Sequence, residues 1–406
     1  MGCQSKNILI IGTMDTKAEE ALYMSEIIKK RGHNASLMDI GISGTVPFKP
    51  EFTREEVALA TGRPFGEVIA SAAGRYADAL STMANGAKAI IEELNAQRKI
   101  DGLLSLGGSQ GTCQALTIMR NLPLRISKFA ISTVAFIAEI INSEVVSIDQ
   151  AMSQSIADLE GLNRITRLAL QRAAGAICGM VEEQKEEEDK KRAIAISSLG
   201  VFEYAGHCKK LLQEKGYEPI VFHSVGTGAM EKIIQQGYVS GVLDLTCYEL
   251  INLVTGGAIR GGEEKFSAAC EKGIPQVIAP GALDFFPWPI AMPFPDRWVE
   301  RKKIRHGFVD LVMTLPEEQK ETALRLANKI NKTTVPITVL VPLFGFSCLD
   351  RSKEMPFYDF GAGKRFAAVL RENVSNPLVE IEEIDAHIND PGFVERATDL
   401  LLKNLL

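Results

Sequence analysis

The sequence predicts an α/β protein of two Rossmann-like subdomains, each an open, mostly parallel sheet flanked by helices. Three observations predict this fold class. A strand–helix–strand order starts at residue 7, the same order restarts at residue 193, and a charged run, Gln184–Lys191, separates the two stretches. Alternating strands and helices are typical of parallel sheets. We therefore expect an N-terminal subdomain over residues 1–183 and a C-terminal subdomain over residues 192–406.

Composition and charge indicate a globular protein and argue against some partners. The chain has 406 residues, 46% hydrophobic and 24% charged, and is too long for one ordinary core. A net charge of −6 argues against binding nucleic acid by neutralising phosphates. The seven cysteines form no CxxC pair, which is typical of reduced thiols. No apolar run approaches the ~20 residues of a membrane helix. We expect a cytoplasmic protein without nucleic-acid or membrane partners.

The first predicted strand is Asn7–Ile11, and polar residues follow it directly. The candidate ligand-binding residues before the next helix are Gly12, Thr13, Asp15, Thr16 and Lys17. Ligands bind at the carboxyl ends of strands in such sheets, and Lys17 is a cation available there. The alternative is that these side chains cap the helix predicted over Ala18–Arg31, which accounts for one of them and not for the whole set.

A second glycine turn lies in Asp101–Thr112, DGLLSLGGSQGT. This stretch predicts a buried strand, a glycine turn and the first turn of a helix. Such a turn directs backbone N–H groups outward, with the positive end of the helix dipole behind them, and suits a phosphate or a carboxylate. It is neither a Walker loop nor GxGxxG. The alternative is a turn that needs small residues for packing. The candidate residues are Gly107, Gly108, Ser109, Gly111 and Thr112.

A long helix is predicted over Pro64–Gln97, and it carries Arg75. An arginine in an alanine-rich helix is usually solvated, so Arg75 matters only if the helix passes over the pocket. A small-residue run, Ala173–Ala176, allows another helix to approach closely and predicts a packing surface between subunits. Further elements of this half are predicted over Ala130–Val134, Val145–Ile148 and, as a helix, from Ser153 to Val181.

The second subdomain again places polar residues after predicted strands. The candidate catalytic residues at these strand ends are His223, Glu249 and Asp284. A catalyst needs a nucleophile, an acid–base group or a metal, and these side chains offer acid–base chemistry. The alternative is that His223 makes a structural hydrogen bond and has no catalytic role. The histidines show no metal-ligand spacing, so no protein metal site is predicted.

The segment Phe285–Trp298, FFPWPIAMPFPDRW, has no periodicity and predicts a loop. A loop so apolar is either buried at an interface or lies over a ligand. Together with the small-residue helix, it exposes more apolar surface than a monomer tolerates. We therefore expect a homodimer. Strands at Pro336–Pro342 and Val379–Ile384, followed by an amphipathic helix, complete the chain.

Six short motifs occur along the chain in one order. They are GTMDTK at 12–17, GGSQGT at 107–112, GLNRI at 161–165, FHSVGTG at 222–228, GALD at 281–284 and HINDP at 387–391. Together they resemble the family of the amino-terminal, ATP-binding-like region of the tomato-mosaic-virus resistance protein, which includes largely uncharacterised bacterial proteins. The resemblance covers nearly the whole chain.

This resemblance implies two Rossmann-like subdomains, nucleotide binding in the first, and dimerisation. The nucleotide-site positions it carries over are Gly12, Thr13, Asp15, Thr16, Lys17, Arg75, Gly107, Gly108, Ser109, Gly111 and Thr112. The implied cofactor is ATP, with or without Mg²⁺, which would need only Asp15 or a phosphate-bound water. Plant relatives continue into a barrel similar to phosphoenolpyruvate hydrolases, and bacterial relatives can have this barrel as a separate chain. A separate barrel protein is therefore an expected partner.

The second subdomain departs from the family pattern. A TTPC-like turn is replaced by Val201–Tyr204 and a threonine run by Asp244–Tyr248, so hydroxyl donors give way to bulk and one carboxylate. Two functions remain. One is an enzyme, or enzyme subunit, acting on a small carboxylated or phosphorylated metabolite in a cleft between the halves; the other is a nucleotide-binding regulatory or interaction module. Converging polar groups in the second half would favour the enzyme, whereas filling by Phe202, Tyr204 and Tyr248 would favour the module.

Overall fold

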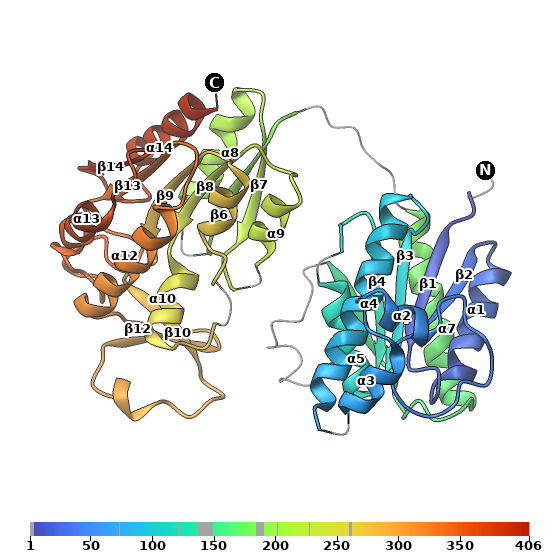
Figure 1. Cartoon of the computed structure of the whole chain (residues 1–406). Coiled ribbons are helices and arrows are strands. Elements are labelled where there is room, and N and C mark those ends of the chain that lie inside the picture. Colours follow the sequence, from blue (N-terminus) through green and yellow to red (C-terminus); the bar gives the residue numbers. More distant parts are fainter. Residues whose placement is uncertain are drawn as a thin grey trace. The chain divides into compact units, whose positions relative to one another are not determined.

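The computed structural model describes residues 4–72, 74–120, 122–136, 149–183, 191–200, 202–226, 228–259 and 262–405. The chain divides into two compact units, residues 1–187 and 188–406. Each unit contains a parallel sheet flanked by helices (Figure 1), which confirms the predicted fold class. The strand predicted at Val145–Ile148 lies outside the described residues, as does nearly all of the charged run.

The sheet of the first unit has the strand order β2-β1-β3-β4-β5, and all neighbouring strands are parallel. Its strands are β1 (Asn7–Gly12), β2 (Asn34–Asp39), β3 (Gly102–Gly107), β4 (Ser127–Ser132) and β5 (Gln150–Gln154). The chain moves from β1 to β2 on one side and then to β3 on the other, so the strand order reverses between β1 and β3. Open parallel sheets bind ligands outside the carboxyl ends of the strands at such a point.

Helices cover both faces of this sheet because β1 is apolar on both sides. Leu9 and Ile11 face one core, and Ile8 and Ile10 face the other, as expected when successive side chains alternate. The first core is covered by α2 (Arg54–Leu59), α3 (Phe65–Ala72), α4 (Tyr76–Ala96) and α5 (Ser109–Met119). The second core is covered by α1 (Ala18–Lys30) and α7 (Arg164–Glu182).

Two predicted helices of this unit are wrong in extent. The stretch predicted as one helix over residues 64–97 forms α3 and α4, which are interrupted before Tyr76. The helix predicted from Ser153 begins only at Arg164, because residues 150–154 pair with β4 as strand β5. Asn163 then starts the helix, since its side chain accepts the N–H groups of the first turn at 2.9 and 3.0 Å.

The second unit has a six-stranded parallel sheet of order β14-β13-β9-β8-β6-β7. Its strands are β6 (Ala193–Ser198), β7 (Glu218–His223), β8 (Gly241–Thr246), β9 (Gln276–Gly281), β13 (Ile337–Pro342) and β14 (Val379–Ile384). Its helices are α8 (Tyr204–Glu214), α9 (Ala229–Gln235), α10 (Tyr248–Thr255), α11 (Ser267–Lys272), α12 (Pro316–Ile330), α13 (Ala362–Asn373) and α14 (Pro391–Asn404). The strand order reverses between β6 and β8, as it does between β1 and β3.

The prediction of a loop over residues 285–298 is wrong for its first part and correct for residues 290–295, which form neither helix nor strand. Its first part is strand β10 (Phe285–Pro289), which joins β12 (Val309–Met313) and β11 (Lys303–His306) in an antiparallel sheet. Phe286 and Trp298 are fully buried and pack edge to face, with ring centroids 4.7 Å apart. The aromatic side chains therefore form a small core of their own.

The two features from which we expected a homodimer are internal to their units. Ala173 and Ala174 are fully buried in the core between α7 and the sheet, and Phe286 and Trp298 are buried in the small core described above. Ile290 and Met292 of the same aromatic segment are exposed, at 43% and 46%. The homodimer stays a prediction that rests on the family resemblance.

The crossing of α2 and α4 depends on Gly86. A Cβ at this position would lie 1.8 Å from the carbonyl oxygen of Val57, which follows the start of α2 by three residues. We predict that Gly86→Ala lowers the free energy of unfolding by about 3 kcal/mol or more, because α2 must move away from α4. Urea unfolding followed by circular dichroism measures the change.

Gly175→Ala in α7 is the matched control. Apart from the backbone of α7 itself, no heavy atom of the described residues lies within 4 Å of a Cβ placed on Gly175. Alanine should stabilise this helix by about 0.5–1 kcal/mol, because glycine loses more backbone entropy on folding. Equal unfolding midpoints for the two variants would contradict the tight crossing of α2 and α4.

Candidate functional site

Two glycine turns lie side by side at the carboxyl edge of the first sheet. They follow β1 and β3, which are hydrogen-bonded neighbours. A Cβ on Gly12 would lie 2.9 Å from Leu106 Cδ2, and a Cβ on Gly107 would lie 3.1 Å from the backbone of Gly111. Packing therefore requires glycine at the last residue of each strand. Part of the alternative interpretation, a turn built from small residues for packing, is correct for these two positions.

Packing does not explain the other two glycines of the second turn. A Cβ on Gly108 would meet only Thr133 Oγ1, at 3.8 Å, and a Cβ on Gly111 would meet only the carbonyl oxygen of Leu106, at 3.9 Å, within the described residues. These are ordinary van der Waals distances. Neither glycine has a positive φ angle. Within the described fold, neither space nor backbone conformation requires glycine there, which leaves close approach of a ligand as a reason.

The helix after the second turn offers the better anion site. α5 begins at Ser109, its first turn carries no acidic residue, and no side chain of the described residues caps its N-terminus. Its first N–H groups have no intrahelical acceptor, and the positive end of the helix dipole lies behind them. α1 also lacks a side-chain cap, but Glu19 and Glu20 in its first turn oppose an anion. A phosphate is therefore better placed at α5 than at α1.

The polar residues of the first turn do not cap α1. The Thr13 and Thr16 hydroxyls lie 2.9 Å apart, and no side chain makes a capping hydrogen bond to the helix. Lys17 is the residue that precedes α1, and its ammonium forms no hydrogen bond or ion pair with the described residues. The capping interpretation is therefore wrong for this turn. Two hydroxyls and one ammonium stay available to a ligand.

Asp15 turns toward the loop after β2. A Cβ on Gly41 would lie 3.0 Å from Oδ1 of Asp15 and from Oδ1 of Asp39. Asp39 accepts the backbone N–H groups of Met14, at 3.0 Å, and Gly41, at 2.8 Å, and thereby ties the first turn to β2. Burial raises the pKa of Asp39 even though these hydrogen bonds oppose the shift. Asp15 Oδ1 is buried and has no hydrogen-bond partner among the described residues.

The Thr112 side chain has a structural role. Its side chain is buried, and its hydroxyl lies 2.7 Å from the Ser132 hydroxyl at the end of β4. The hydroxyl also lies 3.4 Å from the carbonyl oxygen of Gly107. Thr112 therefore fastens α5 to the sheet, and its hydroxyl is directed away from solvent.

Arg75 immediately precedes α4 and is mostly solvated. Its side chain is 79% exposed and lies 3.9 Å from Asp78 of the same helix. Gln114 of α5 contacts the carbonyl oxygens of Leu80, at 3.3 Å, and Ile40, at 3.4 Å, so the start of α4 lies near the carboxyl end of β2. Arg75 is thus at the edge that carries the turns, without an observed contact to either.

Glu20 was not among the residues singled out from the sequence. It joins the GLNRI motif to the start of α1, the helix that follows the first glycine turn. Glu20 is 1% exposed, and its carboxylate accepts the N–H of Gly161 at 2.8 Å. The Thr166 hydroxyl of α7 donates to the carbonyl oxygen of Gly161 at 3.0 Å. A glutamate on the apolar side of α1 was the available signal, because a buried carboxylate needs a partner.

The three candidate catalytic residues of the second unit have separate surroundings. His223 is exposed at the end of β7, Glu249 is buried at the start of α10, and Asp284 is buried after β9. No hydrogen bond or ion pair joins any two of them within the described part of the chain. The predicted grouping is therefore not formed by direct contacts.

Glu249 belongs to a buried cluster that sequence reasoning did not find. Lys265 is 1% exposed, and its ammonium lies 2.7 Å from Asp244 and 3.1 Å from Glu249. Burial alone would lower the pKa of Lys265, but the charges of Asp244, Glu249 and Glu231 outweigh burial and raise it. Burial raises the pKa of Glu231 to about 7, against the opposing effect of Lys265. Glu249 is therefore engaged in an ion pair inside the protein.

Asp284 belongs to a second buried network. The Ser347 hydroxyl donates to it at 2.6 Å, and the backbone N–H of Ser347 donates to Asp350 at 3.0 Å. Burial, and then the charge of Asp350, raises the pKa of Asp284 well above its usual range. His387 lies 2.9 Å from the Ser347 carbonyl through Nε2, and its Nδ1 accepts a backbone N–H, so the ring is neutral and donates through Nε2. The HINDP turn thus holds the strand ends together.

Aromatic side chains fill the carboxyl edge of the second sheet. Phe202, Tyr204 and Tyr248 are 9%, 1% and 7% exposed and belong to the main core of this unit. Phe202 and Tyr204 stack with ring centroids 4.8 Å apart, and the Tyr204 hydroxyl donates to the Ser197 carbonyl at 2.9 Å. Aromatic side chains and buried polar clusters thus both occur in the second unit.

The described ranges contain neither a metal-binding cluster nor a membrane-spanning helix. There, no set of three or more His, Cys, Asp or Glu side chains is arranged to hold a metal ion. Among the same residues, no helix combines the length and apolar character needed to cross a bilayer.

The buried cluster predicts a pH-dependent stability. The pKa of Glu231 is raised from its ordinary value of 4.5 to about 7 in the folded protein. The contribution of Glu231 to the free energy of unfolding is therefore complete below pH 4.5 and is lost as the pH rises through 7. We predict that Glu231→Gln raises the free energy of unfolding at pH 8 by on the order of 3 kcal/mol and changes it little at pH 5. Urea unfolding from pH 5 to pH 8 measures both values.

Glu214→Gln is the control for this experiment. Glu214 is an exposed residue near the end of α8 in the same unit. Its variant should keep the pH profile of the unmodified protein. A Glu231→Gln variant whose stability falls between pH 5 and pH 8 as steeply as that of the unmodified protein would show that Glu231 is not the titrating group.

Relatives at 30% identity or more cover nearly the whole chain. A UPF0261 protein of Clostridium tetani is 34% identical over 394 residues, which is 96% of each chain. A second, from Brucella suis, is 34% identical over 97% of this chain and 94% of its own. The tomato (Solanum lycopersicum) ToMV resistance protein Tm-1(GCR237) is 30% identical over 98% of this chain, which covers 56% of the tomato protein.

Similar solved structures are much more distant. They include a UDP-GlcNAc 2-epimerase from Neisseria meningitidis bound to UDP-GlcNAc, with 10% identity, a TM-score of 0.24, and coverage of 67% of this chain and 82% of that one. The enzyme of this name from Methanocaldococcus jannaschii has 10% identity and a TM-score of 0.22 over 98% and 92% of the two chains. Similarity at this level adds nothing to the functional argument.

Family matches agree with the relatives. Residues 6–186 match the N-terminal domain of uncharacterised protein family UPF0261, and residues 191–405 match the C-terminal domain of the same family. The resemblance expected from the six motifs is confirmed, because the tomato resistance protein is among the relatives. The chain belongs to the UPF0261 family.

Proposed function

We propose that this protein binds ATP at the two glycine turns of its first unit. The observation that carries the proposal is the pairing of β1 with β3, which brings both turns to the point where the strand order reverses. Gly108 and Gly111 support it, because neither is required by packing within the described residues. ATP is the nucleotide that the motif resemblance implies.

Each group at this edge has a role in the proposed complex. The uncapped N-terminus of α5 receives the phosphates through backbone N–H groups. Lys17 supplies a full positive charge, and the hydroxyls of Thr13 and Thr16 supply hydrogen bonds. Asp15 Oδ1, which has no hydrogen-bond partner among the described residues, is the oxygen that a Mg²⁺ ion accompanying the nucleotide would use.

The second unit favours a regulatory or interaction role over catalysis. Phe202, Tyr204 and Tyr248 occupy the carboxyl edge of its sheet, and Glu249 is held by Lys265. We therefore propose a nucleotide-binding module that acts through protein contacts. An enzyme acting on a small carboxylated or phosphorylated metabolite, with His223, Glu249 and Asp284 as catalytic groups, stays the alternative. A homodimer, a separate barrel partner and a cytoplasmic location stay predictions.

A charge placed at the start of α5 separates binding from stability. Ser109 is exposed at the first position of the helix. Ser109→Asp should stabilise the helix by about 0.3–1 kcal/mol, because a carboxylate there complements the dipole. The same charge repels phosphates, so we predict about tenfold or more weaker ATP binding by calorimetry.

Ser109→Asn is the matched control, since it has the size of aspartate without the charge. It should bind ATP nearly as the unmodified protein does. Equal ATP affinity in the Asp and Asn variants would show that the phosphates do not bind at the start of α5. Thermal unfolding of both variants verifies that the fold is retained.

The two candidate cations should contribute unequally. We predict that Lys17→Ala weakens ATP binding by about 1–2 kcal/mol, because it removes a charge-assisted contact. Arg75→Ala should cost less, about 0–1 kcal/mol, since its side chain is 79% exposed and already faces Asp78. Calorimetry on both single variants ranks them. Undiminished ATP affinity after Lys17→Ala would falsify the assignment of that residue.

A further inference from the structure

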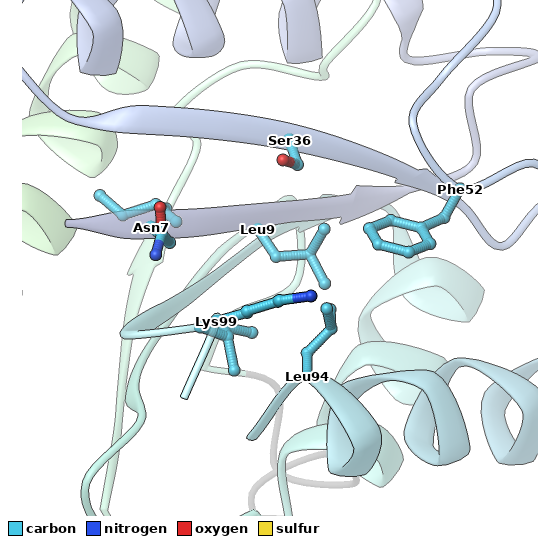
Figure 2. A pocket seen from close by; sticks show the side chains of 8 residues that line it. Asn7, Leu9, Ser36, Phe52, Leu94 and Lys99 are labelled. Atoms are coloured by element: carbon cyan, nitrogen blue, oxygen red, sulfur yellow. The ribbon is translucent and has the colours of Figure 1, made fainter. Parts of the chain in front are cut away.

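A pocket opens on the first unit, beside the stretch of β1 that precedes the first glycine turn (Figure 2). Its volume is 260 Å³. Leu9 lies on its wall, three residues before Gly12, which is about 10 Å of extended strand. The side chains that decide its chemistry are Asn7, Leu9, Ser36, Phe52, Leu94 and Lys99.

The pocket combines an apolar wall with one cation. Leu9, Phe52 and Leu94 supply carbon surface. Figure 2 shows the Lys99 side chain extending between Leu9 and Leu94, with its ammonium directed toward the Phe52 ring. Within the described residues, this ammonium forms no hydrogen bond or ion pair. Lys99 is exposed, so a solvated positive charge lies at an apolar cavity, and the Asp101 carboxylate accepts the backbone N–H of the lining residue Asn7 at 2.7 Å.

The backbone that presents Lys99 is an unusual helix end. The N–H of Lys99 donates to the Leu94 carbonyl at 2.8 Å and that of Arg98 to the Asn95 carbonyl at 3.0 Å, the two hydrogen bonds of a Schellman motif. Arg98 has φ +56°, where glycine is usual, and Lys99 takes a position usually filled by an apolar residue. A side chain at such a φ angle costs about 1 kcal/mol. The Schellman geometry itself therefore does not call for a lysine at position 99.

Neighbouring groups hold this helix end in place. Arg125 donates to the carbonyl oxygens of Asn95, at 2.9 Å, and Ile100, at 3.1 Å, one on each side of Lys99. On the strand side, Asn7 is fixed by Asn34, whose amide donates to its side-chain oxygen at 2.9 Å. The walls are thus largely pre-formed, which reduces the entropy lost when a ligand binds.

We propose that this pocket binds a small carboxylic acid with an apolar body, such as an arylacetic or branched alkanoic acid. The carboxylate pairs with the Lys99 ammonium, and the body packs against Leu9, Phe52 and Leu94. Ser36 and Asn7 supply neutral polar groups on the strand wall. The volume of 260 Å³ lies just below the usual range of about 300–1,000 Å³ for small-molecule sites, which suits a small acid.

The test uses phenylacetate, 4-methylpentanoate and the uncharged phenylacetamide as probes of the full chain. Saturation-transfer NMR and calorimetry should detect both acids and show weaker binding of the amide. Lys99→Met should weaken binding of the acids about tenfold, because it removes the charge and keeps the length of the side chain. Methionine suits the apolar position of the Schellman motif, so the variant should unfold at the same temperature or higher.

Lys88→Met is the matched control. Lys88 lies in α4, the helix that ends shortly before Lys99, and is outside the pocket; its ammonium is 3.6 Å from Glu92. This variant should bind the acids normally. Acid binding should also persist in Ser109→Asp, so a failure of this site is distinct from a failure of the ATP site. No binding of either acid to the unmodified protein, equal binding of acid and amide, or equal affinity in Lys99→Met and the unmodified protein would each overturn the proposal.

Discussion

The parallel pairing of β1 with β3 is the constraint on which the first unit depends. The register runs from Ile8 opposite Gly102 to Ile11 opposite Ser105, so the two strands end together. Gly12 must lack a side chain because Leu106 of the neighbouring strand occupies that space. The turns after both strands consequently leave the sheet at one place, with the uncapped start of α5 beside them. The proposed nucleotide site follows from this arrangement of the backbone.

The second unit shows that the same topology does not determine the same use. Its strand order also reverses, between β6 and β8, at the position that corresponds to β1 and β3. Yet Phe202, Tyr204 and Tyr248 fill that edge, and Lys265 draws Glu249 into a buried ion pair. A fold supplies a place for a site, whereas the side chains decide whether the place stays open. In this chain aromatic side chains occupy that edge in the second unit, whereas glycines, hydroxyls and Lys17 occupy it in the first.

Local patterns predicted most of the strands and both glycine turns, because a strand, the glycine turn after it and the next helix are encoded by adjacent residues. The errors have physical reasons. The aromatic segment from Phe285 looked like a loop because its partner, β12, lies about twenty residues later and no local period records the pairing. The helix expected from Ser153 starts at Arg164 because pairing with β4 overrides local propensity. The cluster around Lys265 joins two helices, a strand and the turn before α11, which spacing cannot reveal.

By itself, the sequence determined the fold class, the family and the positions of the glycine turns, since these depend on neighbouring residues and short motifs. Only the tertiary structure decided which polar groups stay available. It turned the Thr112 hydroxyl toward Ser132, left the Lys17 ammonium without a partner among the described residues, and placed Lys99 at a cavity. The reason is that hydrogen bonding and burial depend on residues far apart in the chain, which only packing brings together.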